Sequence, residues 1–194
     1  MHQGVYDQFV DKLVARAKAM KVGHALEVRT QIGPVVSEQK LSENMAYVDL
    51  AAKEGAEHLC GGERLEILTD RYYMTSGVFV GTNNVMRINR EEMFAPLACV
   101  IPVAGYDEAL HVVNDTNFGL TSGIVTINLA RATHFRRNAK TGCVMVNFPT
   151  AGADYHVPFG GRGDSSYGPR EQGIYVAEFY TIVKTSYISS GQPS

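Results

Sequence analysis

Three short apolar runs in the second half of the chain decide the fold: Ala98-Cys99-Val100-Ile101-Pro102-Val103, Gly123-Ile124-Val125-Thr126-Ile127 and Cys143-Val144-Met145-Val146. Each run has the length of a strand, and the predominance of apolar residues favours buried strands. Two helices are predicted between the runs. Asp107 caps the first, which runs to Val113, and Asn128 caps the second, which runs to about Lys140 with Gly142 as its stop. Strands that alternate with helices favour parallel pairing, so the fold class is α/β with a parallel, Rossmann-like sheet.

Two further helices are predicted upstream. The first presents one apolar face and ends near Gly23; its face consists of Tyr6, Phe9, Val10, Leu13, Val14 and Ala17. The second is capped by Ser37 and stops at Gly55, and its expected inward residues are Leu41, Met45, Val48 and Ala52. Two short extended segments are predicted after the second helix and before the first apolar run, at residues 72–74 and 77–80.

The region after residue 147 changes character. Residues 148–168 are rich in Gly, Pro, Ser and Thr without periodicity, which is typical of a functional loop packed on a sheet. A last helix is predicted over about residues 170–179. Residues 181–188 are rich in β-formers and predict a strand-like arm.

Composition bounds the class of protein. The 194 residues are 45% hydrophobic and 20% charged, as in a globular domain, and the net charge of -2 gives no basic surplus for nucleic acid. No apolar stretch is long enough to span a membrane. The three scattered cysteines fit a reducing compartment, so a cytoplasmic location without disulfides is expected. The six histidines are equally dispersed, and no metal site is predicted.

Each cysteine is a candidate nucleophile, because covalent chemistry on a carbonyl needs a thiolate. Cys99 and Cys143 lie in apolar runs, where burial raises the pKa of a thiol, so both are interpreted as structural. Cys60 precedes Gly61-Gly62 on an expected turn and should be more exposed, but no base neighbours it in the sequence. We therefore predict no catalytic residue among the three.

Two polar stretches have local explanations that need no function. Glu91-Glu92 alone fits a solvated carboxylate pair at the start of a strand. The stretch Gly160-Gly161-Arg162-Gly163 lacks the G-K-[S/T] and G-x-G-x-x-G spacings of phosphate loops. It is interpreted as a tight loop that lets backbone approach another element.

Larger motifs carry a family resemblance. Glu91-Glu92-Met93-Phe94-Ala95-Pro96, Pro158-Phe159-Gly160-Gly161 and Phe179-Tyr180-Thr181-Ile182-Val183-Lys184-Thr185 occur in the order and spacing of the C-terminal half of an aldehyde dehydrogenase. Anchors such as Ile32-Gly33-Pro34 and Asn114-Asp115 extend the match over essentially the whole chain. The segment from Pro149 to Gly173 resembles the 2-oxoglutarate semialdehyde (2,5-dioxopentanoate) dehydrogenases. One departure is Ala95, where the family usually has glycine.

The resemblance implies specific roles. Glu92 would hold the hydroxyls of the nicotinamide ribose of NAD or NADP, and Phe94 would pack beside the ring. Asn147, Phe148 and Phe159 would line the pocket for a small-molecule aldehyde. For an acidic semialdehyde, His156 and Arg162 are candidate contacts to the carboxylate.

The resemblance also implies a domain organisation. Residues 1–178 would be the C-terminal part of the catalytic domain, truncated at its N-terminus, and residues 179–194 an oligomerisation arm and tail. The strand at residues 181–188 would pair across subunits of a homo-oligomer. The family's thiolate, general-base glutamate and oxyanion-holding side chain are expected outside this chain, which would be inactive alone.

Two other interpretations remain open. The first is a non-catalytic truncated product that acts as an oligomerisation or interaction module. The second is a related acyl-phosphate reductase, which the motifs at residues 92–96 and 158–161 fit less well.

Overall fold

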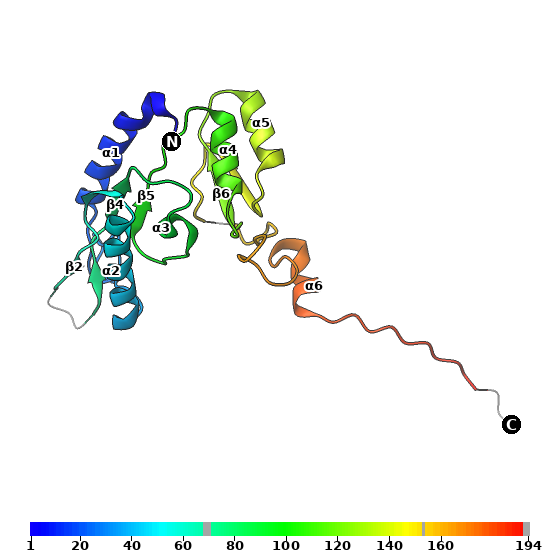
Figure 1. The fold of residues 1–194 in the computed structure, drawn as a ribbon. Coiled ribbons are helices and arrows are strands. Elements are labelled where there is room, and N and C mark those ends of the chain that lie inside the picture. The colour runs from blue at the N-terminus through cyan, green and yellow to red at the C-terminus, as the bar shows by residue number, and fades with distance from the viewer. Residues whose placement is uncertain (68–70, 153, 192–194) are drawn as a thin grey trace. The chain divides into compact units, whose positions relative to one another are not determined.

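The computed structural model describes residues 1–67, 71–152 and 154–191 and divides the chain into two compact units (Figure 1). Met1–Asp115 form unit 1 and Thr116–Ser194 form unit 2. Within the described ranges, no helix combines the length and apolar character needed to cross a membrane.

Unit 1 is built on a three-stranded sheet in the order β1 (Glu57–Cys60), β4 (Gly77–Val80) and β5 (Leu97–Cys99). Strand β1 pairs antiparallel with β4, which pairs parallel with β5. All four residues of β4 are buried, as expected for a central strand covered on both faces. A separate ribbon joins β2 (Arg64–Leu65) to β3 (Tyr73–Met74).

Helix α1 (Tyr6–Ala19) covers part of this sheet and follows the short 3-10 helix η1 (Gln3–Val5). Its Val10 packs with Val80 and Val100, as the apolar periodicity predicted. Tyr6, Leu13 and Val14 join the same cluster, together with Leu59 of β1. The predicted face is confirmed for these residues, whereas Phe9 remains 39% exposed.

Helix α2 (Glu38–Lys53) begins as predicted, because the Ser37 hydroxyl accepts a hydrogen bond of 3.1 Å from the Lys40 amide. Its buried stripe is Leu41, Asn44 and Ala51, with Val48 packed against the core. The prediction that Ala52 points inward is wrong, since Ala52 is exposed. The true stripe includes a polar residue, which an apolar pattern cannot locate.

The second core cluster of unit 1 lies beneath α2. It contains Ala51, Ala56, Phe79, Met86 and Ile88, with Val48, Met93, Leu97 and Cys99 packed against it. Ile88 comes from the one-turn helix α3 (Arg87–Arg90). Helix α4 (Tyr106–Asn114) begins after Gly105, so the prediction that Asp107 caps it is wrong. Asp107 lies in the first turn instead, where its charge favours the positive end of the helix dipole.

Unit 2 contains the parallel pair β6 (Thr121–Ile124) and β7 (Cys143–Val146), connected through α5 (Leu129–Asn138). The predicted crossover is confirmed, and Asn128 caps α5 by accepting a 3.0 Å hydrogen bond from the Arg131 amide. Strand β6 ends at Ile124, earlier than predicted, which leaves Val125 and Ile127 exposed. Helix α5 ends at Asn138, two residues before the predicted Lys140.

The glycine-rich loop does bring backbone segments together. A Cβ placed on Gly142 would lie 1.9 Å from the Gly160 carbonyl oxygen. The Arg162 amide donates to the Gly119 carbonyl at 3.0 Å, and Asp164 donates to Asn117 at 3.0 Å. The interpretation as a tight loop is therefore confirmed.

The last predicted helix is shorter than expected. Arg170 and Glu171 are not helical, because Glu171 pairs with Phe159 through hydrogen bonds of 2.8 and 3.1 Å. Gln172 then has a positive φ of 67°, and only the 3-10 turn η2 (Gly173–Tyr175) and α6 (Val176–Tyr180) follow.

The predicted arm at residues 181–188 is extended, and it pairs with no strand in the part of the chain that the structure describes (Figure 1). Its apolar side chains Ile182, Val183, Tyr187 and Ile188 are at least 92% exposed. A strand needs a partner for its backbone groups, so the arm cannot be assigned as a strand in one copy.

Candidate functional site

Glu92 and Phe94 lie in the connection between α3 and β5 of unit 1. The backbone hydrogen bonds described for residues 91–96 are those from the Glu91 amide to the Arg87 carbonyl and from the Gly77 amide to the Pro96 carbonyl. Phe94 adopts a left-handed backbone conformation with φ of 49°, which is uncommon for a residue with a side chain. Such conformations persist only when their surroundings hold them in place, and they cluster at functional sites.

The adjacent carboxylates Glu91 and Glu92 have different surroundings. Arg87 donates to both oxygens of Glu91, from Nε at 2.7 Å and from Nη2 at 3.1 Å. The Tyr47 hydroxyl adds a hydrogen bond of 2.8 Å to Glu91 Oε2. Glu92 is exposed and has no hydrogen bond or ion pair within the described ranges. The explanation of a simple solvated pair is therefore wrong for Glu91 and holds for Glu92 alone.

The same contacts shift two pKa values. Arg87 and then Tyr47 lower the pKa of the Glu91 carboxyl below its ordinary value, because both stabilise the charged form. The hydrogen bond to Glu91 raises the pKa of Tyr47 for the converse reason. The carboxylate of Glu91 is consequently charged and already bonded to Arg87 and Tyr47, whereas the carboxylate of Glu92 is available to a ligand.

Phe94 is 77% exposed and lies at the edge of a groove of about 600 Å³. The groove is largely apolar and is lined by Ile32, Gly33, Pro34, Val35, Val36, Lys40, Met74, Phe94, Ala95 and Pro96. Among these lining residues Lys40 is the cation, and its Nζ lies 3.3 Å from Glu43 Oε2. Sequence reasoning gave Lys40 no role, although its place in the first turn after the Ser37 cap could have indicated that it lies near Gly33-Pro34.

Asn147 lies at the carboxyl end of β7 in unit 2, and its side chain bonds to the backbone of Thr126 beyond β6. We call these two hydrogen bonds the Asn147 clasp. Its Oδ1 accepts from the Thr126 amide at 2.8 Å, and its Nδ2 donates to the Thr126 carbonyl at 3.0 Å. Its own amide donates to Ile124 at 2.9 Å. The φ of 57° at Asn147 is a left-handed value that asparagine tolerates better than most residues. The side chain therefore replaces strand pairing where the β6–β7 ladder ends.

This clasp shapes an open depression of about 720 Å³. Its lining residues are Val125, Thr126, Ile127, Asn147, Phe148 and Pro149. Phe148 is 76% exposed and supplies its largest aromatic surface. The structure thus brings together two of the three predicted substrate-pocket residues. Phe159 does not line this depression and is held instead by its pairing with Glu171.

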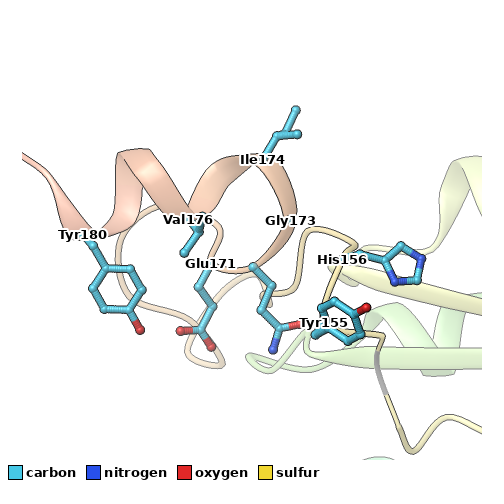
Figure 2. Close-up of a pocket in the computed structure, with 8 residues that line it drawn as sticks. Tyr155, His156, Glu171, Gly173, Ile174, Val176 and Tyr180 are labelled. Carbon is cyan, nitrogen blue, oxygen red and sulfur yellow. The ribbon is translucent and has the colours of Figure 1, made fainter.

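A second depression of unit 2, of about 590 Å³, lies beside α6 (Figure 2). It is lined by Tyr155, His156, Glu171, Gln172, Gly173, Ile174, Val176 and Tyr180. In Figure 2, Glu171 and Tyr180 extend to the side of the helix opposite Ile174. His156 meets Tyr155 edge-on at a ring separation of 5.4 Å, whereas Arg162 is exposed and absent from this lining.

All three cysteines are free thiols, and none has the surroundings of a nucleophile. Burial raises the pKa of Cys99 to about 11, so its thiol is protonated at neutral pH. Cys143 Sγ contacts the Gly160 carbonyl at 3.9 Å. The prediction that Cys60 lies on an exposed turn is wrong, because it ends β1 and is half-buried. His58 approaches its carbonyl at 3.0 Å, not its sulfur.

Among the residues that the structure describes, no three His, Cys, Asp or Glu side chains gather as metal ligands. The candidate chemistry therefore rests on two places. One is the segment of unit 1 that carries the exposed Glu92 and, two residues later, Phe94 at its groove. The other is the depression around Asn147 and Phe148.

Comparisons with known proteins give these places a context. A profile of the Aldehyde dehydrogenase family matches residues 1–186. Alpha-ketoglutarate semialdehyde dehydrogenase of Haloferax volcanii is 41% identical over 192 residues, covering 97% of this chain and 39% of that protein. Alpha-ketoglutaric semialdehyde dehydrogenase of Bacillus subtilis is 35% identical over 190 residues, with the same two coverages of 97% and 39%.

A solved structure agrees with these relatives. Betaine aldehyde dehydrogenase from Staphylococcus aureus in complex with NAD+ superposes with a TM-score of 0.87 at 29% identity, covering 92% of this chain and 36% of that one. The chain belongs to the aldehyde dehydrogenase family, and the predicted α/β fold of that family is confirmed. It spans 39% of the length of the two curated relatives.

Proposed function

We propose that this chain forms part of an NAD(P)-dependent dehydrogenase that oxidises a small aldehyde, 2-oxoglutarate semialdehyde, to the carboxylic acid. The observation that carries the proposal is the contrast between Glu91, whose carboxylate is held by Arg87 and Tyr47, and Glu92, whose carboxylate has no partner among the described residues. The identity to semialdehyde dehydrogenases of 35–41% supports the choice of substrate.

The residues of unit 1 fit the nicotinamide riboside part of NAD or NADP. A carboxylate only accepts hydrogen bonds, so Glu92 would take those donated by the ribose hydroxyls. The exposed ring of Phe94 and the apolar groove beside it would receive the flat nicotinamide face. The bound nicotinamide would supply hydride acceptance, and the chain's part is to orient the ring and exclude water from it.

In unit 2, Asn147 and Phe148 would shape one wall of the aldehyde pocket, and Phe159, which does not line their depression, would supply a separate one. The Asn147 clasp would fix the backbone that carries Phe148, whose exposed ring supplies an apolar wall. The hydrogen bonds to Glu171 would fix Phe159 in a separate stretch. His156 and Arg162 stay candidate contacts for the substrate carboxylate, and both are exposed.

None of the three cysteines serves as the nucleophile in this proposal, so we expect the chain alone to be inactive. The protonated Cys99 thiol and the backbone contacts of Cys143 support that expectation. The three free cysteines also support a reducing compartment, which would be the cytoplasm.

A second candidate function is an oligomerisation or interaction module, and the arm favours it. Residues 181–188 combine unpaired backbone with exposed apolar side chains, which is typical of a strand that pairs with another copy. In the division predicted from sequence, this arm follows the catalytic part at residue 179. Both candidates share the expectation of a homo-oligomer.

The test is NADH formation by this chain with 2-oxoglutarate semialdehyde and with a simple aliphatic aldehyde. We expect none from the chain alone. We expect turnover when the same residues are joined to a segment that carries a cysteine nucleophile, and a raised KM for NAD+ in the Glu92→Gln variant. Turnover by the chain alone would contradict the proposal, since one of the three cysteines would then have to act.

A further inference from the structure

Residues 91–94 are held in place by contacts from two helices, α3 and α2. The Glu91 amide bonds to Arg87 within α3, and the next backbone bond to β4 comes from the Pro96 carbonyl. Between these points the chain turns through the left-handed Phe94. A segment with so little backbone bonding and a strained residue needs external contacts to keep one conformation.

Two side chains of α2 provide those contacts. The Tyr47 hydroxyl binds Glu91 Oε2 at 2.8 Å. Asn44 is completely buried, and one atom of its side-chain amide lies 3.1 Å from the Met93 carbonyl oxygen and 3.2 Å from the Lys40 carbonyl oxygen. Two carbonyls can only accept, so we assign Nδ2 to this position, where it donates to both. Residues 44 and 47 lie three apart, so they project from one face of the helix. One contacts the residue before Glu92 and the other the residue after it.

Arg87 completes the arrangement from α3. Its two hydrogen bonds to Glu91 satisfy the charge of that carboxylate, so Glu91 serves as an anchor. The ion pair is 60% exposed on the arginine side, and such pairs contribute little stability by themselves. Positioning of the segment is therefore a better explanation than stability for the two side chains, Arg87 and Tyr47, that bond to this carboxylate.

We propose that Asn44 and Tyr47 are positioning residues that fix the backbone on both sides of Glu92 and present its free carboxylate to the ribose hydroxyls of the cofactor. This inference rests on the proposed role of Glu92. It adds that cofactor affinity depends on two residues of α2 that do not touch the cofactor.

The experiment is an NMR study of the full chain, in which NADH is titrated to millimolar concentration and followed by the amide shifts of residues 92–95. The variants are Glu92→Gln, Tyr47→Phe, Asn44→Ala and Glu91→Gln. The matched control is Tyr72→Phe, which removes a hydroxyl of unit 1 that has no partner within the described ranges. Backbone order parameters of residues 92–94 are measured in the same samples.

We expect Glu92→Gln to weaken NADH binding about 10-fold and Tyr47→Phe about 3- to 10-fold, as for lost hydrogen bonds to a charged group. Glu91→Gln keeps an acceptor for Tyr47, so it should retain more affinity than Tyr47→Phe. Order parameters at residues 92–94 should fall from about 0.85 to below about 0.6 in Tyr47→Phe. Those of β4 and all values in Tyr72→Phe should not change.

Two results would overturn the inference, and they are distinguishable. Unchanged order parameters in Tyr47→Phe, together with unchanged NADH affinity, would refute positioning while leaving the role of Glu92 intact. If Asn44→Ala does not fold, Tyr47→Phe decides alone. An NADH affinity that is the same in Glu92→Gln as in the wild type would refute the cofactor role of Glu92. It would also refute the positioning role of Asn44 and Tyr47, which depends on it.

Discussion

Unit 1 and unit 2 bury very different amounts of apolar surface. Unit 1 contains two clusters of buried side chains, and its largest fully buried residues include Tyr73 and Phe79. In unit 2, the buried hydrophobic residues among those described are Phe135 and Ala139. Most of the large exposed apolar side chains also belong to unit 2, including Val125, Ile127 and the whole arm. Unit 1 can thus be stabilised by its own core, whereas unit 2 relies more on backbone clasps and tight loops.

The largest expected effect tests the core of unit 1. Phe79→Ala should lower the free energy of unfolding of unit 1 by about 3–5 kcal/mol, because it removes a fully buried ring from a packed cluster. Urea unfolding followed residue by residue by NMR gives the value. The matched control Phe148→Ala, at an exposed ring of unit 2, should change stability by less than about 0.5 kcal/mol. Equal effects would remove the difference between the units.

The next effect tests the tight loop of unit 2. Gly142→Ala would place a Cβ 1.9 Å from the Gly160 carbonyl oxygen and 2.6 Å from Arg170 Nη1. Backbone must shift to relieve this overlap, so unit 2 should lose roughly 3 kcal/mol. Gly191→Ala, where no heavy atom lies within 4 Å, is the control in the same unit. A neutral Gly142→Ala, measured in the same urea titration, would show that the loop is not closely packed in solution.

A smaller loss is expected from the Asn147 clasp. Asn147→Ala removes both hydrogen bonds to Thr126 and places a less tolerant residue at positive φ, so we expect a loss of about 1–3 kcal/mol in unit 2. Asn147→Gly relieves the backbone but still loses the bonds, and the difference between the two variants isolates the strain. Both are measured by thermal unfolding. Wild-type stability in both would mean that the clasp has no stabilising role.

The smallest expected effect is a loss of stability of unit 1 at low pH. The pKa of Asp115 is lowered by Arg90 and then by Asn84, and that of Glu91 is lowered by Arg87 and then by Tyr47. Depressed folded-state values stabilise the protein above the unfolded pKa of about 4, and this contribution is lost as pH falls through the folded values. Unit 1 should therefore lose stability below about pH 4. Asp115→Asn should flatten that loss, as measured by urea midpoints at several pH values, and an unaltered pH profile would contradict it.

Apolar periodicity predicted much of this fold, because most of its elements bury an apolar face. It located α1, β4, β7 and the crossover between β6 and β7, and the capping residues Ser37 and Asn128 are confirmed. It failed where polar groups decide the structure. The buried side-chain amide of Asn44 faces two backbone carbonyls, and no periodicity in the sequence marks such a residue.

The residues of the candidate site were predicted from the family motifs and not from the chemistry of the individual residues. Phe94 lines a groove two residues after Glu92, and Asn147 lies with Phe148, but Phe159 does not line the depression around Asn147. The difference between Glu91 and Glu92 depends on Tyr47, which is distant in sequence, so adjacent identical residues could not be told apart. The final helix was overestimated because the pairing of Glu171 with Phe159 is also a long-range contact.

The left-handed backbone at Phe94 and Gln172 has a consequence for how these positions can vary. Glycine would relieve the φ values of 49° and 67° at both positions, so a mutational scan selected only for folding should enrich glycine there. A scan selected for NADH formation, with these residues joined to a segment that carries a cysteine nucleophile, should reject glycine at position 94, because glycine removes the ring that would pack beside the nicotinamide. The ratio of glycine enrichment between the two selections would therefore measure, at each position, how much stability is lost by having a side chain there instead of glycine.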